Sequence, residues 1–119
     1  QIVHAVKDLA PTIIFAKGAW ASIGAMAETG AAGLGIDWCI PPKTAREFAG
    51  DNITHQGNFD PAKLKAPDEV IKREVKKMIT DFGPGRYIAN LGHGILPTVP
   101  VDSARAFVDT VKEFDYSTL

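Results

Sequence analysis

The sequence predicts an α/β fold in which helices connect the strands of a parallel sheet. After one initial helix, four short apolar runs alternate with four segments whose apolar residues recur at helical spacing. Parallel strands need such crossover helices, so this order indicates a parallel sheet. Each run also ends in polar residues, which a parallel sheet gathers at its carboxyl edge. These residues are Lys17, Asp37, Asn58 with Asp60, and Asn90 with His93.

The first half of the chain contains two of the four predicted strands. A helix over residues 2–10 ends before Pro11, and the β-branched and aromatic run 12–16 follows it as a strand. A second helix contains Trp20, Ile23, Gly24 and Ala27 on one face and stops at Gly30. The apolar run 31–38 is the next strand. A short helix then follows the two prolines at 41–42 and ends at Gly50.

The second half contains the other two strands and the clearest helix. Run 53–57 is a weaker strand because three of its residues are polar, and run 86–91 is typical of a strand covered on both faces. Between them, Pro67 fits the first position of a helix. The last helix opens at residues 100–102. The inward residues predicted for the two helices are Ile71, Val75, Met78, Ile79 and Phe82, and then Ala104, Phe107, Val108 and Val111.

Length and composition predict one globular domain over residues 1–119, with no internal boundary. The net charge of -1 arises from interspersed signs, which gives no electrostatic footprint for nucleic acid or an anionic membrane. Cys39 is the only cysteine, so no internal disulfide can form and a reducing compartment is expected. No signal peptide or membrane span is evident, which makes the cytosol the default expectation. Because Gln1 opens within an amphipathic pattern without an initiator methionine, we expect that an upstream segment exists.

Two closures of the sheet are compatible with this order. Four strands suffice for an open, doubly wound sheet, but no phosphate-binding glycine fingerprint follows the first strand. A (β/α)8 barrel needs eight strands and about 250 residues. The polar residues at the strand ends nevertheless favour the barrel, because barrel enzymes assemble their sites on that face.

His93 is the leading site candidate from local pattern. It stands between Gly92 and Gly94, which offer backbone freedom at the end of a predicted strand. An unperturbed imidazole has a pKa of about 6.5, so such a histidine can be a cation or a neutral donor and acceptor. A histidine that only hydrogen-bonds its own loop is an equally weighted alternative.

Four segments together resemble the uroporphyrinogen decarboxylase family. They are IIFAK at 13–17, GIDW at 35–38, QGNFDP at 56–61 and NLGHG at 90–94, and the resemblance extends over residues 2–114. It implies a (β/α)8 TIM barrel about three times this length. The chain is then four consecutive β/α units, the C-terminal half barrel with strands five to eight.

The resemblance also implies an activity. The parent enzyme is a carboxy-lyase of porphyrin and heme biosynthesis that acts without a cofactor and converts uroporphyrinogen III to coproporphyrinogen III. The expected partners are this substrate, the missing N-terminal half and a second copy in a homodimer. The expected compartment is the cytoplasm, or the plastid in a photosynthetic eukaryote. In this half, His93 is the one substrate-binding residue, with no catalytic residue and no metal ligand, so the fragment alone is predicted to be inactive.

The other polar residues at the strand ends have structural interpretations. Asp37 is expected to hold a neighbouring backbone group or a lysine rather than to act in catalysis. Lys17 is expected to brace the barrel mouth, although attraction of propionate groups is an alternative. Asn58 and Asp60 are interpreted as turn formers, because both side chains readily bond their own backbone. Cys39 is interpreted as a small buried residue.

The two other histidines carry no site prediction. His4 belongs to the predicted first helix and His55 to the strand run 53–57. Neither has a partner at the spacing of metal ligands.

Two rival functions remain open. A methyltransferase of the same superfamily would hold zinc through a histidine and two cysteines, but the last strand ends in Gly92-His93-Gly94 without a cysteine. The other rival is an isolated half barrel that acts as an interaction module, because runs 12–16 and 86–91 would be unpaired sheet edges.

Overall fold

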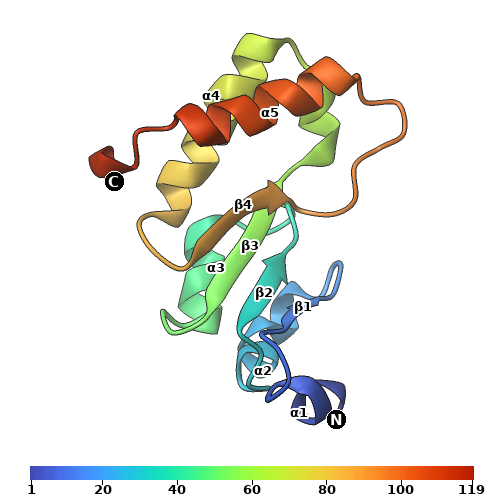
Figure 1. The fold of residues 1–119 in the computed structure, drawn as a ribbon, viewed down its shortest axis with the longest axis vertical. Coiled ribbons are helices and arrows are strands. Elements are labelled where there is room, and N and C mark those ends of the chain that lie inside the picture. Colours follow the sequence, from blue (N-terminus) through green and yellow to red (C-terminus); the bar gives the residue numbers. More distant parts are fainter.

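The computed structural model describes residues 1–119 and contains a four-stranded parallel sheet in the order β1-β2-β3-β4 (Figure 1). The four predicted strands and their parallel arrangement are therefore confirmed. The strands are β1 (Ile13–Phe15), β2 (Gly33–Ile36), β3 (Thr54–Phe59) and β4 (Tyr87–Leu91). The register aligns Phe15, Gly35, Gln56 and Ile88 in one row across the sheet.

The helices follow the strands as predicted and pack in chain order, α2 on α3, α3 on α4 and α4 on α5. Figure 1 shows α4 and α5 lying side by side on the β4 side of the sheet. No helix has both the length and the apolar character that a membrane crossing requires. The α-helices are α1 (Ile2–Val6), α2 (Ile23–Ala27), α3 (Pro42–Ala49), α4 (Asp68–Phe82) and α5 (Val101–Glu113), with 3-10 turns at Trp20–Ser22, Pro61–Lys65 and Tyr116–Thr118.

The core lies between the helices and one face of the sheet. The predicted stripe of α4 is confirmed, since all five of its apolar residues are buried. Leu34 and Ile36 of β2 are also buried, at 0% and 1% exposure. Aromatic contacts join the layers: Phe59 meets Phe107 edge-on at 5.3 Å between ring centroids. These contacts fix the sheet against α4 and α5.

The opposite face of the sheet, here called the inner face, is open. Ile13 and Phe15 are each 46% exposed on it, and Ile88 is 43% exposed. The prediction that run 86–91 is covered on both faces is therefore wrong. Successive strand residues point to opposite faces, and the helices of this chain cover only one of them. Only the side chains that alternate with Ile88 reach the core.

Two helical predictions also need correction. The first helix stops at Val6 instead of residue 10, and Leu9 is 82% exposed, because nothing packs on it. In α5, Val108 is 45% exposed, while the small or polar residues Ser103 and Thr110 are buried. The tail, which carried no prediction, forms the turn Tyr116–Thr118, capped by the Asp115 side chain.

The close approach of β2 and β3 requires glycine at position 57. Gly57 has a φ of +144°, and a Cβ there would overlap the carbonyl oxygen of Ile36. Its own carbonyl accepts a hydrogen bond of 2.6 Å from the hydroxyl of Tyr87 on β4. Three strands thus meet at a point that has no room for a side chain.

We expect Gly57→Ala to lower the free energy of unfolding by about 1–3 kcal/mol, because the added methyl group overlaps backbone that cannot move aside. Denaturant unfolding of the purified protein measures this. Gly94→Ala is the matched control, since no heavy atom lies within 4 Å of the position its methyl group would take and its φ is not positive. Equal midpoints for the two variants would refute the proposed crowding.

Candidate functional site

The carboxyl edge of the sheet is organised by the loop 37–40, which follows β2. The Asp37 carboxylate is 5% exposed and accepts hydrogen bonds from the amides of Gly18, at 2.9 Å, and Cys39, at 3.3 Å. Burial acts to raise the pKa of Asp37, but these amide groups outweigh it and hold the pKa below its ordinary value. The interpretation of Asp37 as a residue that holds neighbouring backbone is confirmed.

Asn58 fastens β3 to the same loop. Its Nδ2 donates to the carbonyl oxygens of Asp37, at 3.1 Å, and Ile40, at 2.7 Å. The interpretation of Asn58 as a turn former is therefore wrong, because β3 extends to Phe59 and the side chain reaches a different strand's loop. For Asp60 the interpretation is confirmed, since its Oδ1 accepts from the amide of Ala62, at 2.9 Å.

The end of β4 also packs closely against this loop. A Cβ on Gly92 would lie 2.5 Å from the backbone nitrogen of Trp38, so only glycine fits there. The amide of Gly92 donates to the carbonyl of Phe59, at 2.7 Å, which continues the pairing of β4 with β3. His93 therefore leaves the sheet from a fixed point.

A hollow of about 410 Å³ lies on the inner face beside these strand ends. Its floor is partly apolar, because the Phe15 side chain lies over Gly35, where a Cβ would approach it to 2.8 Å. Polar groups come from the two later strands and the following turn. The lining residues are Phe15, Gly35, Ile36, Gln56, Asn90, Leu91, Gly92, His93, Gly94 and Ile95.

His93 is half-buried in the wall of this hollow. Its Nδ1 lies 2.9 Å from the carbonyl oxygen of Gly94. A carbonyl oxygen can only accept, so Nδ1 carries the hydrogen in this contact and Nε2 has no partner in the chain. The two interpretations of His93, loop bond and site residue, are thus compatible, because each uses a different nitrogen.

Two amide side chains share the hollow with His93. Asn90 is exposed, and its Oδ1 accepts from the amide of Leu91 at 2.8 Å. Gln56 stands in the row of Phe15 and Gly35 and makes no hydrogen bond through its side chain. Sequence reasoning missed Gln56, although its place at an alternate position of a polar strand could have assigned it to the inner face.

The family model for uroporphyrinogen decarboxylase (URO-D) matches residues 1–114. The chain belongs to the uroporphyrinogen decarboxylase family. It is 52% identical over 114 residues to the uroporphyrinogen decarboxylase of Flavobacterium johnsoniae, which covers 96% of this chain and 33% of that protein. The human uroporphyrinogen decarboxylase is 48% identical over 101 residues, which covers 85% of this chain and 28% of that protein. The chain thus spans about a third of the length of the curated relatives it matches.

A solved structure supports the fold of this family. The methyltransferase from Methanosarcina mazei superposes with a TM-score of 0.75 at 25% identity, over 88% of this chain and 32% of the other. Together with the four parallel β/α units, this establishes a half of a TIM-barrel-like fold. The predicted fold class and family are confirmed.

Other candidates from the sequence lie outside the hollow. Lys17 is exposed and makes no hydrogen bond or ion pair, so the structure contains no bracing contact from it. Cys39 is exposed, so its interpretation as a buried residue is wrong; the bonds of Asp37 and Asn58 hold the loop backbone and leave its thiol outside. His4 lies in α1 as predicted.

His55 is part of the core rather than of a site. It is 0% exposed on β3, and neither ring nitrogen has a hydrogen-bond partner. Burial, aided by the positive charge of Arg46, lowers the pKa of His55, so the ring is neutral at neutral pH. No group of three histidine, cysteine, aspartate or glutamate side chains is placed to hold a metal ion.

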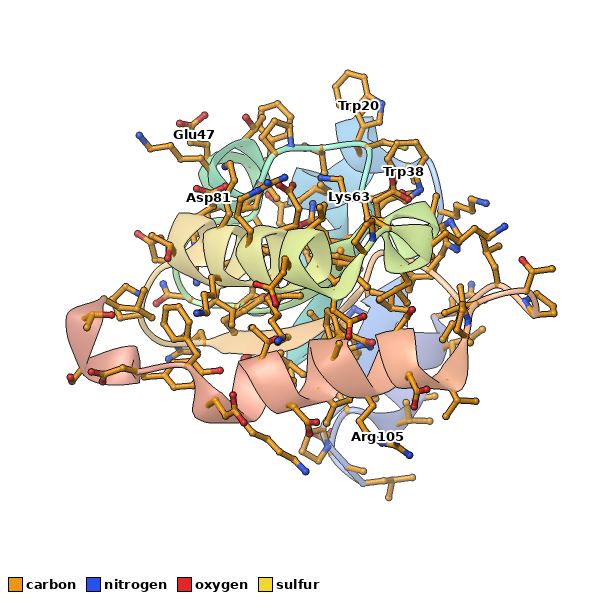
Figure 2. All side chains as sticks on the ribbon, turned by 90° about the horizontal axis from the view of Figure 1, so that it is seen from above. Trp20, Trp38, Glu47, Lys63, Asp81 and Arg105 are labelled. Carbon is orange, nitrogen blue, oxygen red and sulfur yellow. The ribbon has the colours of Figure 1, made fainter.

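A second hollow of about 390 Å³ lies between the loop 37–40 and α4. Figure 2 shows three of its lining residues, Trp38, Lys63 and Asp81, along one side of the molecule. Four of its charged groups are paired, Lys63 with Glu74 at 2.7 Å and Lys77 with Asp81. The fifth, Asp60, has no counter-ion, so the free charge in this hollow is negative, which does not suit an anionic ligand.

We expect Asp37→Asn to lower the free energy of unfolding at pH 7 by about 1–3 kcal/mol, because the amide keeps one acceptor oxygen and loses the charge. The folded pKa of Asp37 lies below its ordinary value of 3.8, so its stabilisation is complete above that pH. It is lost as the pH falls through the folded pKa. Unfolding curves of wild type and Asp37→Asn should therefore converge in acid.

Asp8→Asn is the control for this measurement, because Asp8 is exposed and makes no hydrogen bond. It should leave stability unchanged within about 0.5 kcal/mol at pH 7. A loss of stability by Asp37→Asn that stayed constant from pH 7 to pH 2 would argue against a charge-assisted clamp.

Proposed function

We propose that this chain forms strands five to eight of a uroporphyrinogen decarboxylase barrel, and that the complete enzyme converts uroporphyrinogen III to coproporphyrinogen III. The observation that carries the proposal is the hollow at the carboxyl edge of the sheet, which contains His93. It occurs where barrel enzymes bind substrates, in a chain that matches decarboxylases over nearly its whole length. The pathway is porphyrin biosynthesis, and the cytosol is the expected compartment.

The open inner face supports a second half barrel as the partner of this chain. β1 pairs only with β2, and β4 pairs only with β3, so one edge of each has free peptide groups. Free parallel edges and the exposed Ile13, Phe15 and Ile88 favour association. In the proposed enzyme the N-terminal half of the barrel covers them, and two complete barrels form a homodimer.

His93 is the substrate-binding residue of this half that the sequence predicts. The carbonyl of Gly94 holds Nδ1, which leaves Nε2 to meet the substrate. When Nε2 is also protonated, the imidazolium donates a charge-assisted hydrogen bond to a carboxylate. The substrate carries carboxylates on every ring, so this role fits its chemistry. The acid-base group and the cationic groups that bind the other carboxylates belong to the rest of the proposed enzyme.

The proposed chemistry uses the substrate itself as the electron sink. Protonation of a pyrrole carbon allows the ring to accept the electron pair of the breaking carbon–carbon bond. Carbon dioxide leaves each acetate, and a proton takes its place to give a methyl group. The enzyme therefore has mainly to position the substrate and stabilise charge.

An interaction module without catalysis is the second candidate, because the same free edges would serve it. Methyl transfer has less support: the methyltransferase structure is 25% identical to this chain, whereas the Flavobacterium johnsoniae decarboxylase is 52% identical.

The first test compares the 119-residue protein with the product of the complete reading frame. We expect the isolated chain to form no coproporphyrinogen III from uroporphyrinogen III, because most of the site is absent. The complete protein, of about three times the mass by intact mass spectrometry, should form it. Activity of the isolated chain, or an inactive but folded complete protein, would overturn the proposal.

The second test replaces His93 in the complete protein. Loss of a charge-assisted hydrogen bond is worth about 1.5–3 kcal/mol, so His93→Ala should lower kcat/KM by about 10- to 100-fold. His4→Ala is the control, because His4 is exposed on α1. Unchanged steady-state kinetics for His93→Ala would exclude His93 from substrate binding.

A further inference from the structure

The Asn90 side chain lines the same hollow as His93 and is accessible to a ligand. Asn90 is in β4, three residues before His93. The side chain is exposed rather than packed in the core. It is also held, because Oδ1 accepts the hydrogen bond from the amide of Leu91 at 2.8 Å.

This bond determines which way the amide of Asn90 faces. If the group were flipped, its NH2 would meet the N–H of Leu91, and two donors would oppose one another. Oδ1 is therefore committed to the backbone, and Nδ2 is left without a partner in the chain. Asn90 is thus an oriented hydrogen-bond donor at the hollow, because the bond to Oδ1 fixes the amide and both hydrogens of Nδ2 are free.

Gln56 does not have this property. Its side chain makes no hydrogen bond, so the amide is free to present either its oxygen or its nitrogen. It also lies deeper, in the row of Phe15 and Gly35, whereas Asn90 is two residues further along its strand toward the carboxyl edge. Asn90 is therefore the amide suited to an acceptor-only ligand group.

We propose that Asn90 is a substrate-binding residue that donates a hydrogen bond from Nδ2 to a carboxylate of the substrate. This inference rests on the proposed decarboxylase function and deepens it. A carboxylate offers only acceptor oxygens, which matches the free Nδ2 donor of a fixed amide. A neutral amide also keeps its donor at every physiological pH, whereas His93 donates from Nε2 only when it is protonated.

The test is Asn90→Asp in the complete protein. The new carboxylate can still accept from the amide of Leu91, but it replaces the donor with a negatively charged acceptor that repels the substrate carboxylate. We expect KM for uroporphyrinogen III to rise at least about tenfold, with kcat changed less than about threefold. The melting temperature should stay near that of the wild type, because the local hydrogen bond is retained.

Asn52→Asp is the matched control. It makes the same change of charge on an exposed residue of the turn before β3, at the opposite end of the strands. It should leave KM unchanged. Asn90→Ala, which removes the side-chain donor without adding charge, should give an intermediate rise in KM. Equal KM values for Asn90→Asp and Asn52→Asp in an active enzyme would overturn the role of Asn90 and leave the decarboxylase function standing.

A binding measurement separates the two proposals if the complete protein is inactive. Uroporphyrin I is a fluorescent ring that carries the same carboxylate side chains, and titration with it reports binding without turnover. Weaker binding by Asn90→Asp than by Asn52→Asp would support a carboxylate site at Asn90 although the decarboxylase function had failed. Equal binding, or no binding by the wild type, would overturn the inference.

Discussion

The structure depends most on the way three strand ends are tied to the loop 37–40. The Asp37 carboxylate holds the turn after β1, through the amide of Gly18. Asn58 on β3 donates to two carbonyls of the loop, and Gly92 at the end of β4 packs against the backbone of Trp38. These polar contacts are largely buried, where a hydrogen bond is stronger and a missing partner is costly. The loop therefore sets the position from which His93 departs.

The inner face of the sheet differs from the core in the residues that it contains. The strands alternate core-facing and inner-facing side chains, and the inner set mixes exposed apolar residues with the amides of Gln56 and Asn90. Glycine at position 35 lets the Phe15 side chain lie flat on the sheet. The result is a shallow surface with an apolar floor and polar walls. The pyrrole rings and carboxylate side chains of the proposed substrate have the same two kinds of surface.

Sequence reasoning succeeded where local patterns determine the outcome. The stripe of α4 repeats at helical spacing and is buried as predicted, and the four strands follow from their alternation with helices. It failed where contacts between segments distant in the sequence determine the position of a side chain. Asn58 has the local chemistry of a turn residue, but its partners lie 18 and 21 residues away. Ile88 has the composition of a doubly covered strand, and only the absence of a second layer over the inner face leaves it exposed.

The charge of the hollow indicates which substrate-binding groups this half supplies and which the rest of the proposed enzyme supplies. Its lining holds one titratable group, His93, and two neutral amides, so it can orient carboxylates but not neutralise many of them. Moving an anion from water into a site costs several kcal/mol unless cations or several donors compensate. The chain as a whole has a net charge of -1 and adds no field that would attract a polyanion. In the proposed enzyme the compensating cations come from the other half barrel, across the inner face that is open in this chain.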